Sequence, residues 1–324
     1  MHHKLRYAIK NSNLISIDEV EKGLACDCTC PACGSTLIAR KGDIKVHHFA
    51  HYKADECNRC VETSLHLLAK EILMEELVIK LPALYLDFGK QSYKMKELIF
   101  EERSFEFDNV YMEKKIDDIV PDIILEYQGN KLLVEIFVTH NIDDEKLYKI
   151  ERMGISTLLI DLSEFEYDTS KEMLKDIIIN STEHKKWVYN KKERAIYNRF
   201  KEKAKPFKKA SNGTGYFCPQ YLYGWKGESS ARWVDCIYCE YCFSIDGEVN
   251  CLGYSGVSKI CDLDNPKLLE EVQNKIKKNE IKSIWLEGTQ CKRCRSGYMT
   301  AKDGAYGKFL GCTNYPRCKN IIKV

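Results

Sequence analysis

Two carboxylates stand inside apolar stretches in the middle of this 324-residue chain. Asp122 follows Pro121 in one predicted strand, and Glu135 lies in the next, within Leu132-Leu-Val-Glu-Ile-Phe. A carboxylate in an apolar strand is unfavourable unless it has a partner, and a divalent cation is a common one. Mg²⁺ or Mn²⁺ held by such a pair can polarise a phosphodiester and acidify an attacking water. We therefore predict that Asp122 and Glu135 bind a catalytic divalent metal ion.

The elements around these carboxylates predict an α/β fold. The turn signal Tyr127-Gln-Gly-Asn-Lys131 predicts a hairpin that would bring Asp122 and Glu135 side by side. Apolar residues at helical spacing predict an amphipathic helix over Glu62–Ile79. The other predicted elements are strands at 83–88, 104–113, 119–127, 131–138 and 156–162 and helices at 142–153 and 170–180. This order favours a mixed sheet with helices on its faces.

The predicted helix also carries a polar face. Glu62, His66 and Lys70 follow one another at intervals of four residues, so they share one side of the helix, opposite its leucines. A lone histidine is more often structural than functional. Its position between an acidic and a basic residue on one face makes His66 a candidate for the same site as Glu62.

The pattern resembles the PD-(D/E)xK nuclease superfamily, in which Pro-Asp and a Glu in an apolar strand occur in an α/β context. The family that it resembles in more detail is that of the CoiA-like competence proteins, which carry an N-terminal zinc motif ahead of this nuclease domain. The resemblance covers about residues 7–165 and rests on Cys30-Pro-Ala-Cys-Gly, His47-His-Phe-Ala-His51, Glu62-Thr-Ser-Leu-His66 and Lys70. It implies a restriction-endonuclease-like core that cleaves DNA strands, with catalytic residues Glu62, His66, Asp122 and Glu135.

One position departs from the superfamily pattern. A lysine is expected two residues after the Glu, and CoiA-like proteins often have Gln there, but this chain has Phe137. We predict that Lys146, on the following helix, takes the lysine's role in orienting or activating water, with Lys70 as the next candidate. Thr139 and His140 also follow Glu135 closely enough to face the site. The alternative is a nuclease fold that binds DNA without cutting it.

The last cysteine module has the clearest motif of the chain. Cys291-x2-Cys294 and Cys312-x5-Cys318, separated by seventeen residues, predict a tetrahedral zinc site. The module resembles the C-terminal zinc finger of type IA topoisomerases, which implies binding of single-stranded DNA. Aromatic residues for base stacking and basic residues for phosphates fit that role: Tyr306, Phe309, Tyr315, Lys302, Lys308, Arg317 and Lys319. The alternative is that some of the aromatic rings fill a small core around the metal.

Two further zinc modules of ribbon type are predicted. In the first, Cys30, Cys33, His48 and His51 form a complete ligand set. Cys26, Cys28, Cys57 and Cys60 are surplus, and Cys57 is the preferred candidate among them to replace a histidine. In the second, the predicted ligands are Cys218, Cys236, Cys239 and Cys251, with Cys242 in reserve and Cys261 expected to be a buried thiol. All three zinc ions are expected to be structural, because each set is closed.

Composition divides the chain into six parts. They are a zinc module at 1–60, the nuclease-like domain at 61–183, a basic linker or helix at 184–210, a central Cys-rich module at 211–263, a helical connector at 264–289 and the finger at 290–324. The net charge of +2 conceals an acidic middle, with ten acidic and three basic residues at 97–126, and basic segments at 184–209 and 290–324. This asymmetry suits metal ions flanked by phosphates, although charge runs are also typical of solvated faces.

The location and partners follow from the same features. With no membrane-length apolar run and no signal peptide pattern, the sixteen cysteines are expected in a reducing cytoplasm, where they bind metal. The expected partner is DNA, single-stranded or with unpaired ends, together with a protein partner in DNA uptake, repair or phage defence. An RNA-directed nuclease is a weaker alternative, because zinc ribbons and stacking aromatic rings do not distinguish DNA from RNA.

Overall fold

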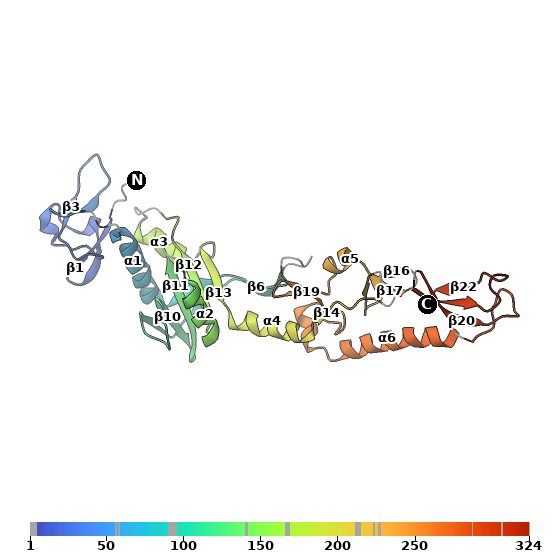
Figure 1. The fold of residues 1–324 in the computed structure, drawn as a ribbon. Coiled ribbons are helices and arrows are strands. Elements are labelled where there is room, and N and C mark those ends of the chain that lie inside the picture. Colours follow the sequence, from blue (N-terminus) through green and yellow to red (C-terminus); the bar gives the residue numbers. More distant parts are fainter. Residues whose placement is uncertain are drawn as a thin grey trace. The chain divides into compact units, whose positions relative to one another are not determined.

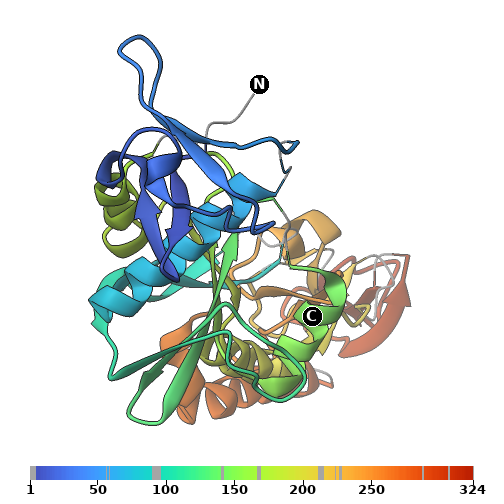
Figure 2. The same cartoon turned by 90° about the vertical axis from the view of Figure 1, so that its left-hand side faces the viewer.

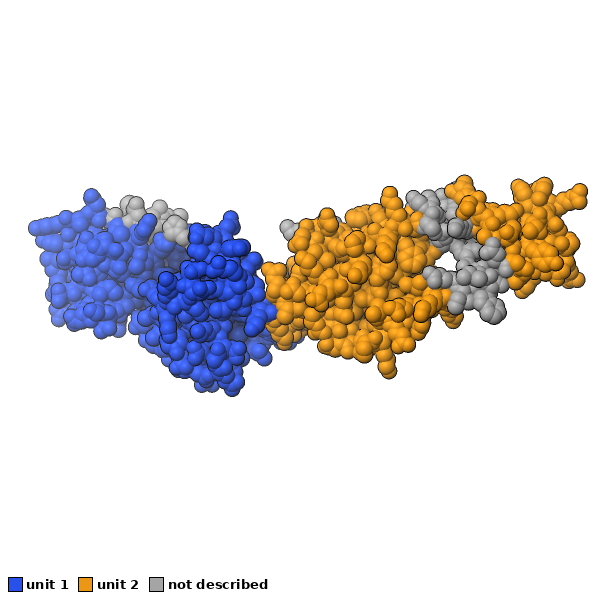
Figure 3. Space-filling view, turned by 60° about the horizontal axis from the view of Figure 1, so that its bottom comes forward, with its two compact units in different colours: residues 1–84, 100–191 blue, residues 85–99, 192–324 orange. Residues whose placement is uncertain are grey.

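The computed structural model forms two compact units, coloured separately in Figure 3. The first unit comprises Met1–Leu84 and Phe100–Lys191, and the second comprises Tyr85–Ile99 and Lys192–Val324. The described residues are 5–55, 57, 59–89, 96–139, 142–165, 169–210, 215–222, 224–225, 228–286, 288–305 and 307–323. Among them, no helix is long and apolar enough to cross a membrane.

The first unit combines small N-terminal strands with a larger α/β body (Figure 1). Its strands are β1 (Tyr7–Lys10), β2 (Asn13–Ser16), β3 (Leu37–Arg40), β4 (His48–His51), β5 (Val78–Leu81), β8 (Arg103–Glu106), β9 (Asn109–Met112), β10 (Ile123–Tyr127), β11 (Asn130–Phe137), β12 (Thr157–Asp161) and β13 (Lys185–Tyr189). Its helices are α1 (Cys60–Glu76), α2 (Asp144–Met153) and α3 (Lys171–Ile179), with short 3-10 turns η1 (Ile17–Glu19) and η2 (Leu24–Cys26). The helices predicted at 142–153 and 170–180 and the strands predicted at 119–127, 131–138 and 156–162 are present. The strand predicted over 104–113 is interrupted and forms β8 and β9, and β5 and β13 were not predicted.

A five-stranded mixed sheet lies at the centre of this unit, in the order β13-β12-β11-β10-β9. β11 and β12 are parallel, and every other neighbouring pair is antiparallel. β10 and β11 form the predicted hairpin, whose two-residue loop has Gln128 and Gly129 at positive φ, as tight hairpins require. The hairpin register places Ile123 opposite Val134, so Asp122 and Glu135 lie at the same end of the two strands.

The sheet buries two different faces because side chains alternate along each strand. Leu132, Val134 and Ile136 of β11 pack in the main core, which includes Leu68 and Ile72 of α1 and residues of α3. Leu133 packs on the other face, against Ile150 of α2. Figure 1 shows α1 and α2 on opposite sides of the green strands. Since Glu135 follows Leu133 by two positions, it belongs to the α2 face.

The N-terminal strands pack beside the start of α1, as Figure 2 shows. The β1–β2 and β3–β4 hairpins share a small core in which Ile17, Leu37 and Phe49 are buried together with cysteines. Tyr7 extends from this part into the main core beside Leu65. The zinc-module sequence and the nuclease-like sequence are therefore packed into one unit.

The second unit is built from short elements around a smaller core. Its strands are β6 (Leu84–Asp87), β7 (Lys96–Phe100), β14 (Lys205–Pro206), β15 (Tyr216–Phe217), β16 (Gly224–Trp225), β17 (Glu228–Ala231), β18 (Cys242–Ile245), β19 (Glu248–Cys251), β20 (Met299–Gly304), β21 (Gly307–Cys312) and β22 (Ile321–Lys323). Its helices are α4 (Lys191–Lys203), α5 (Trp233–Ile237) and α6 (Lys267–Leu286), with η3 (Ile260–Asp264). Residues at the edges of β6, β7 and α4 belong to the first unit.

Residues 85–99 belong to this second unit although they interrupt the sequence predicted as the 61–183 domain. Phe88 is fully buried between Phe200 of α4 and Phe243 of β18, with ring centroids 5.3 and 5.7 Å away. The apolar residues of this segment therefore share one core with α4 and the central cysteine module.

Candidate functional site

Asp122 lies directly before β10 and is held from three directions. His66 Nε2 is 2.9 Å from Asp122 Oδ2, Lys70 Nζ is 3.1 Å from Oδ1, and the Ile136 backbone N–H donates to Oδ2 at 2.9 Å. Burial alone would raise the pKa of this carboxyl, but the His66 hydrogen bond and charge, the Ile136 amide and Lys70 outweigh it and lower the pKa to about 2. Asp122 is therefore an anion at any pH at which the protein would work.

Lys70 is a buried cation that joins two carboxylates. Its side chain is only 3 % exposed, and Nζ lies 2.7 Å from Glu113 Oε1 as well as 3.1 Å from Asp122 Oδ1. A charged lysine is costly to bury unless it is paired with carboxylates in this way. Lys70 and Glu113 thus fix the position of Asp122.

Glu135 is the carboxylate with an unused oxygen. Lys146 Nζ lies 2.6 Å from Glu135 Oε2, whereas the buried Oε1 has no hydrogen-bond partner among the described residues. Burial raises the pKa of Glu135 to about 7, against the opposing effect of Lys146. An oxygen of this kind is costly to leave unpaired, and a divalent cation beside Asp122 would satisfy it. The donor set therefore fits a hard metal ion such as Mg²⁺ or Mn²⁺.

All five predicted catalytic residues border one open cleft of about 720 Å³. Glu62 and His66 come from α1, Asp122 and Glu135 from the hairpin strands, and Lys146 from α2. Phe137 also lines this cleft, so the position expected for the superfamily lysine faces the site but brings no charge. Of the remaining candidates, Thr139 is exposed and His140 lies outside the described residues.

The structure adds one positioning residue that the sequence prediction did not include. Asp143 is the N-cap of α2, and its Oδ1 accepts a hydrogen bond from the Lys146 backbone N–H at 2.7 Å. This bond fixes the first turn of the helix, from which the Lys146 side chain reaches Glu135. Asp before Asp-Glu-Lys is a recognisable cap signal, since Asp is favoured at this position.

Glu135→Gln is expected to stabilise the protein at pH 8 when Mg²⁺ and Mn²⁺ are absent. The pKa of Glu135 rises from its ordinary value of 4.5 to about 7 on folding, so the folded state is penalised as pH rises through this window. A shift of this size corresponds to roughly 3 kcal/mol above pH 7, and the neutral amide avoids that penalty. The gain in stability should shrink towards pH 4.5, where the Glu135 carboxyl and the substituted amide are both neutral in the folded protein.

Thermal unfolding at pH 5 and pH 8, in buffers without chelator so that bound zinc is retained, measures this difference. Glu145→Gln is the matched control, because Glu145 is exposed and paired with Lys149 on the same helix. An unfolding temperature for Glu135→Gln at pH 8 that is no higher than that of the unmodified protein would contradict the prediction.

The N-terminal module brings together three cysteines and one histidine. The sulfurs of Cys30, Cys33 and Cys57 lie within 4.8 Å of one another, and His51 Nε2 is 3.3 Å from Cys33 Sγ. Three thiols and an imidazole are a common structural zinc set. This group can therefore bind zinc.

His48 was predicted as a fourth ligand, but the structure does not place it in this group. His48 and His51 are the first and last residues of β4, and residues three apart in a strand point to opposite faces. His48 Nδ1 instead lies 2.9 Å from the Val46 carbonyl oxygen. Cys57, which was the alternative, occupies the place beside the other two thiols.

The C-terminal module has the most complete ligand set. The four sulfurs of Cys291, Cys294, Cys312 and Cys318 all lie within 4.8 Å of one another, with Sγ–Sγ distances of 3.7 and 3.5 Å for the pairs 291–318 and 294–312. A tetrahedral Zn–S shell places sulfurs about 3.8 Å apart, so the site fits zinc.

Two asparagines that were not predicted support these sulfurs. Asn314 Nδ2 donates to Cys294 Sγ at 3.5 Å, and Asn320 Nδ2 donates to Cys291 Sγ at 3.3 Å. Such donors orient and partly neutralise thiolate ligands. Each follows the Cys312 or Cys318 ligand by two residues, a spacing that could have identified them.

The predicted nucleic-acid residues of this module are partly exposed. Tyr315 is 62 % exposed, Arg317 and Lys319 are exposed, and Lys302 Nζ lies 5.6 Å from the centre of the Tyr315 ring. Phe309 is half-buried opposite Lys302 in the β20–β21 pair. Tyr306 and the Lys308 side chain lie outside the described residues. Tyr298, 56 % exposed, is an aromatic residue of the same module that the prediction omitted.

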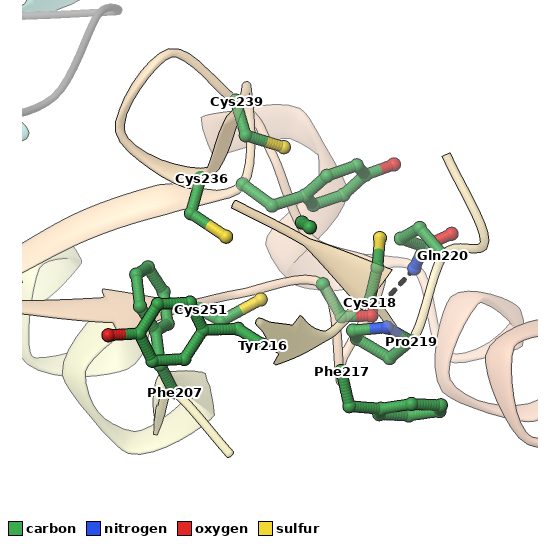
Figure 4. Close-up of a pocket in the computed structure, with 12 residues that line it drawn as sticks. Phe207, Tyr216, Phe217, Cys218, Pro219, Gln220, Cys236, Cys239 and Cys251 are labelled. Carbon is green, nitrogen blue, oxygen red and sulfur yellow. Dashed lines mark hydrogen bonds between the residues drawn. The ribbon is translucent and has the colours of Figure 1, made fainter. Parts of the chain in front are cut away.

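In the central module, Cys218, Cys236, Cys239 and Cys251 line one pocket, shown in Figure 4. Cys242, held in reserve as a ligand, is buried but does not line this pocket. Cys261 was expected to be a buried thiol and is exposed, because it is the second residue of the 3-10 turn η3 at the surface, next to Asp262.

Comparison with known families agrees with the two resemblances seen in the sequence. Residues 15–59 match the family model of the competence protein CoiA N-terminal domain. Residues 288–324 match that of the topoisomerase DNA binding C4 zinc finger. DNA topoisomerase 1 of Mycoplasmoides gallisepticum is 43% identical over 54 residues, which are 16% of this chain and 7% of the relative. No solved structure matches the chain.

These matches cover the two modules whose cysteines converge most closely, and they leave the cleft between Glu62 and Lys146 outside any matched family model. The chain thus combines a segment at residues 15–59 that is similar to the competence protein CoiA N-terminal domain with a segment at residues 288–324 that is similar to the topoisomerase DNA binding C4 zinc finger.

Proposed function

We propose that this protein is a metal-dependent nuclease that hydrolyses phosphodiester bonds in DNA, with a restriction-endonuclease-like core in its first unit. The observation that carries the proposal is the cleft in which Asp122 and Glu135 lie at the same end of two paired strands. Glu135 Oε1, which is buried without a hydrogen-bond partner among the described residues, supports the proposal because a bound metal ion would satisfy this oxygen.

Asp122 and Glu135 would hold the catalytic metal, with Glu62 facing the same cleft from α1. A bound Mg²⁺ or Mn²⁺ would supply charge to the phosphodiester and lower the pKa of water. Because Lys146 now pairs with Glu135, metal binding would free its ammonium group to turn towards the phosphate or the attacking water. Lys70 would stay in place, since burial and two ion pairs hold it.

The C-terminal finger would supply DNA contacts. The matched family is a DNA-binding finger, and the module has a charge of +7 from eight basic residues and one Asp in 290–324. Exposed Tyr315 offers a face for an unpaired base. This arrangement suits single strands or frayed ends, handled with a protein partner in DNA uptake, repair or phage defence.

The direct test incubates the zinc-loaded protein with single-stranded, duplex and branched DNA, with and without Mg²⁺ or Mn²⁺. We expect cleavage that requires the divalent ion. RNA of the same sequences is included as a competing substrate. If RNA is cleaved in preference to DNA, the substrate of the nuclease is RNA. No cleavage of any substrate would exclude the nuclease.

A second candidate is a DNA-binding scaffold without nuclease activity. Phe137 favours it, because this apolar ring lines the cleft where the superfamily has a lysine. The two candidates differ in whether Lys146 provides the missing charge.

Lys146→Ala is expected to lower the cleavage rate by about 10²–10³-fold, because it removes the only lysine paired with Glu135 among the described residues. The metal concentration for half-maximal rate should change little, since the carboxylates remain. Lys149→Ala is the control: Lys149 lies on the same helix, but it pairs with exposed Glu145. A Lys146→Ala rate equal to that of Lys149→Ala would assign the role to another group.

A further inference from the structure

The central module presents four cysteines to a single small cavity. Cys218 follows β15, Cys236 lies in α5, Cys239 follows that helix, and Cys251 ends β19. Figure 4 shows the four sulfurs facing a common space. The rest of the lining is largely apolar and aromatic, including Phe207, Tyr216 and Tyr241. Four thiols in such a pocket lack the polar surroundings that reactive cysteines have.

The backbone around these cysteines forms tight turns. Tyr221 N–H donates to the Cys218 carbonyl oxygen at 3.1 Å, and Cys239 N–H donates to that of Cys236 at 3.1 Å. Turns of this kind direct thiols and neighbouring amides towards one point, as zinc-binding loops do. At Gly253 an added Cβ would lie 3.2 Å from Cys251 Sγ, so the space beside this sulfur is kept free by a glycine.

The neighbouring cysteines are not part of this arrangement. Cys242 is the register partner of Cys251, but it is only 1 % exposed and does not line the cavity. Cys261 is exposed beside Asp262. The structure therefore separates four cavity-facing cysteines from two others in the same sequence region.

The part of the module that carries these four cysteines contains little regular structure. β14, β15 and β16 have two residues each, and α5 has five. Small domains with so little regular structure are generally held by metal ions or disulfides. The four cysteines form no disulfide, so a metal ion is the cross-link that this part of the module could use.

We propose that Cys218, Cys236, Cys239 and Cys251 bind a further structural zinc ion, in addition to the N-terminal and C-terminal sites. This site lies outside both matched family segments and does not depend on the proposed nuclease activity. Its sulfurs are less tightly grouped than those of the C-terminal finger, which all lie within 4.8 Å of one another. Zinc binding would therefore draw the loops after β15, α5 and β19 together and close the cavity.

Zinc content of the purified full-length protein, measured by elemental analysis, tests the site. We expect three zinc ions per chain, and two in Cys236→Ser and in Cys251→Ser. Cys261→Ser is the matched control and should retain three, because it removes an exposed thiol of the same unit. Two zinc ions in the unmodified protein, or three in both cavity variants, would overturn the proposal.

A second measurement remains decisive if the cavity variants do not fold. Cadmium-113 NMR of the unmodified, cadmium-exchanged protein should give two resonances typical of four sulfur ligands and one typical of mixed sulfur and nitrogen ligands. Cys294→Ser should remove one of the four-sulfur resonances, that of the C-terminal finger, and leave the other. A single four-sulfur resonance in the unmodified protein would show that the cavity holds no metal.

Discussion

Asp122→Asn and Glu135→Gln are each expected to reduce metal-dependent DNA cleavage by at least about 10³-fold, a loss of roughly 4 kcal/mol of transition-state stabilisation. Each variant keeps the size of the side chain and removes the charge that a divalent ion requires. Asp122 is ionised at any working pH, since its pKa is lowered to about 2, so its charge is available for metal.

The two variants should differ in the stability of the folded protein. This difference distinguishes a loss of cleavage caused by the missing charge from a loss caused by unfolding. Asp122→Asn leaves Lys70 buried with one carboxylate partner fewer, so it should destabilise the protein. Glu135→Gln should be inactive yet more stable at pH 8, for the reason given above. DNA binding should be largely retained in both, because the C-terminal finger is unchanged.

Single-turnover cleavage at saturating DNA and Mg²⁺ is the measurement, with DNA affinity measured in parallel. Asp118→Asn is the matched control: it neutralises an exposed carboxylate of the same acidic segment, one that pairs with Arg152. Full activity in either active-site variant would remove that residue from the metal site. An equal loss in Asp118→Asn would point to general charge effects.

Removal of residues 289–324 is expected to weaken binding to single-stranded DNA by at least tenfold and to flatten its dependence on salt. The segment 290–324 carries eight of the basic residues, and each phosphate contact that is lost removes counterion release from the binding equilibrium. Stacking contributes roughly 1–3 kcal/mol per base, so Tyr315→Ala alone should weaken binding by about 5- to 150-fold. Cleavage at saturating DNA should survive, because Asp122 and Glu135, the proposed metal ligands, belong to the first unit.

Affinity at several salt concentrations and the single-turnover rate should be compared for the full chain, the truncation and Tyr315→Ala. Tyr315→Phe is the control for stacking, since it keeps the ring and should retain affinity. Unchanged affinity in the truncation would mean that the finger serves another purpose, such as docking to a protein. If the truncation keeps its affinity for DNA but loses the single-turnover cleavage rate, the finger helps to form the active site.

The sequence by itself determined the features that depend on local spacing. The Gln128-Gly129 turn brings the two carboxylate strands together, because a two-residue loop allows only one register. The cysteine pairs of the C-terminal finger converge as their spacing predicts, because both pairs lie in short turns. The helix that begins at Cys60 follows the apolar pattern of its sequence. It ends at Glu76, three residues before the predicted Ile79, because Leu77 adopts a positive φ of 51°.

Only the tertiary structure decided which partners these groups find. The sequence predicted Lys146 for this site with Lys70 as the next candidate, but the pairing of Lys146 with Glu135 and of Lys70 with Asp122 depends on α2 and α1 packing on opposite faces of one sheet. Strand alternation turns His48 away from the cysteines that His51 approaches. Phe88 packs in one core with Phe200 and Phe243, although both residues are more than a hundred positions away in sequence. Apolar burial depends on proximity in space and not on proximity in sequence.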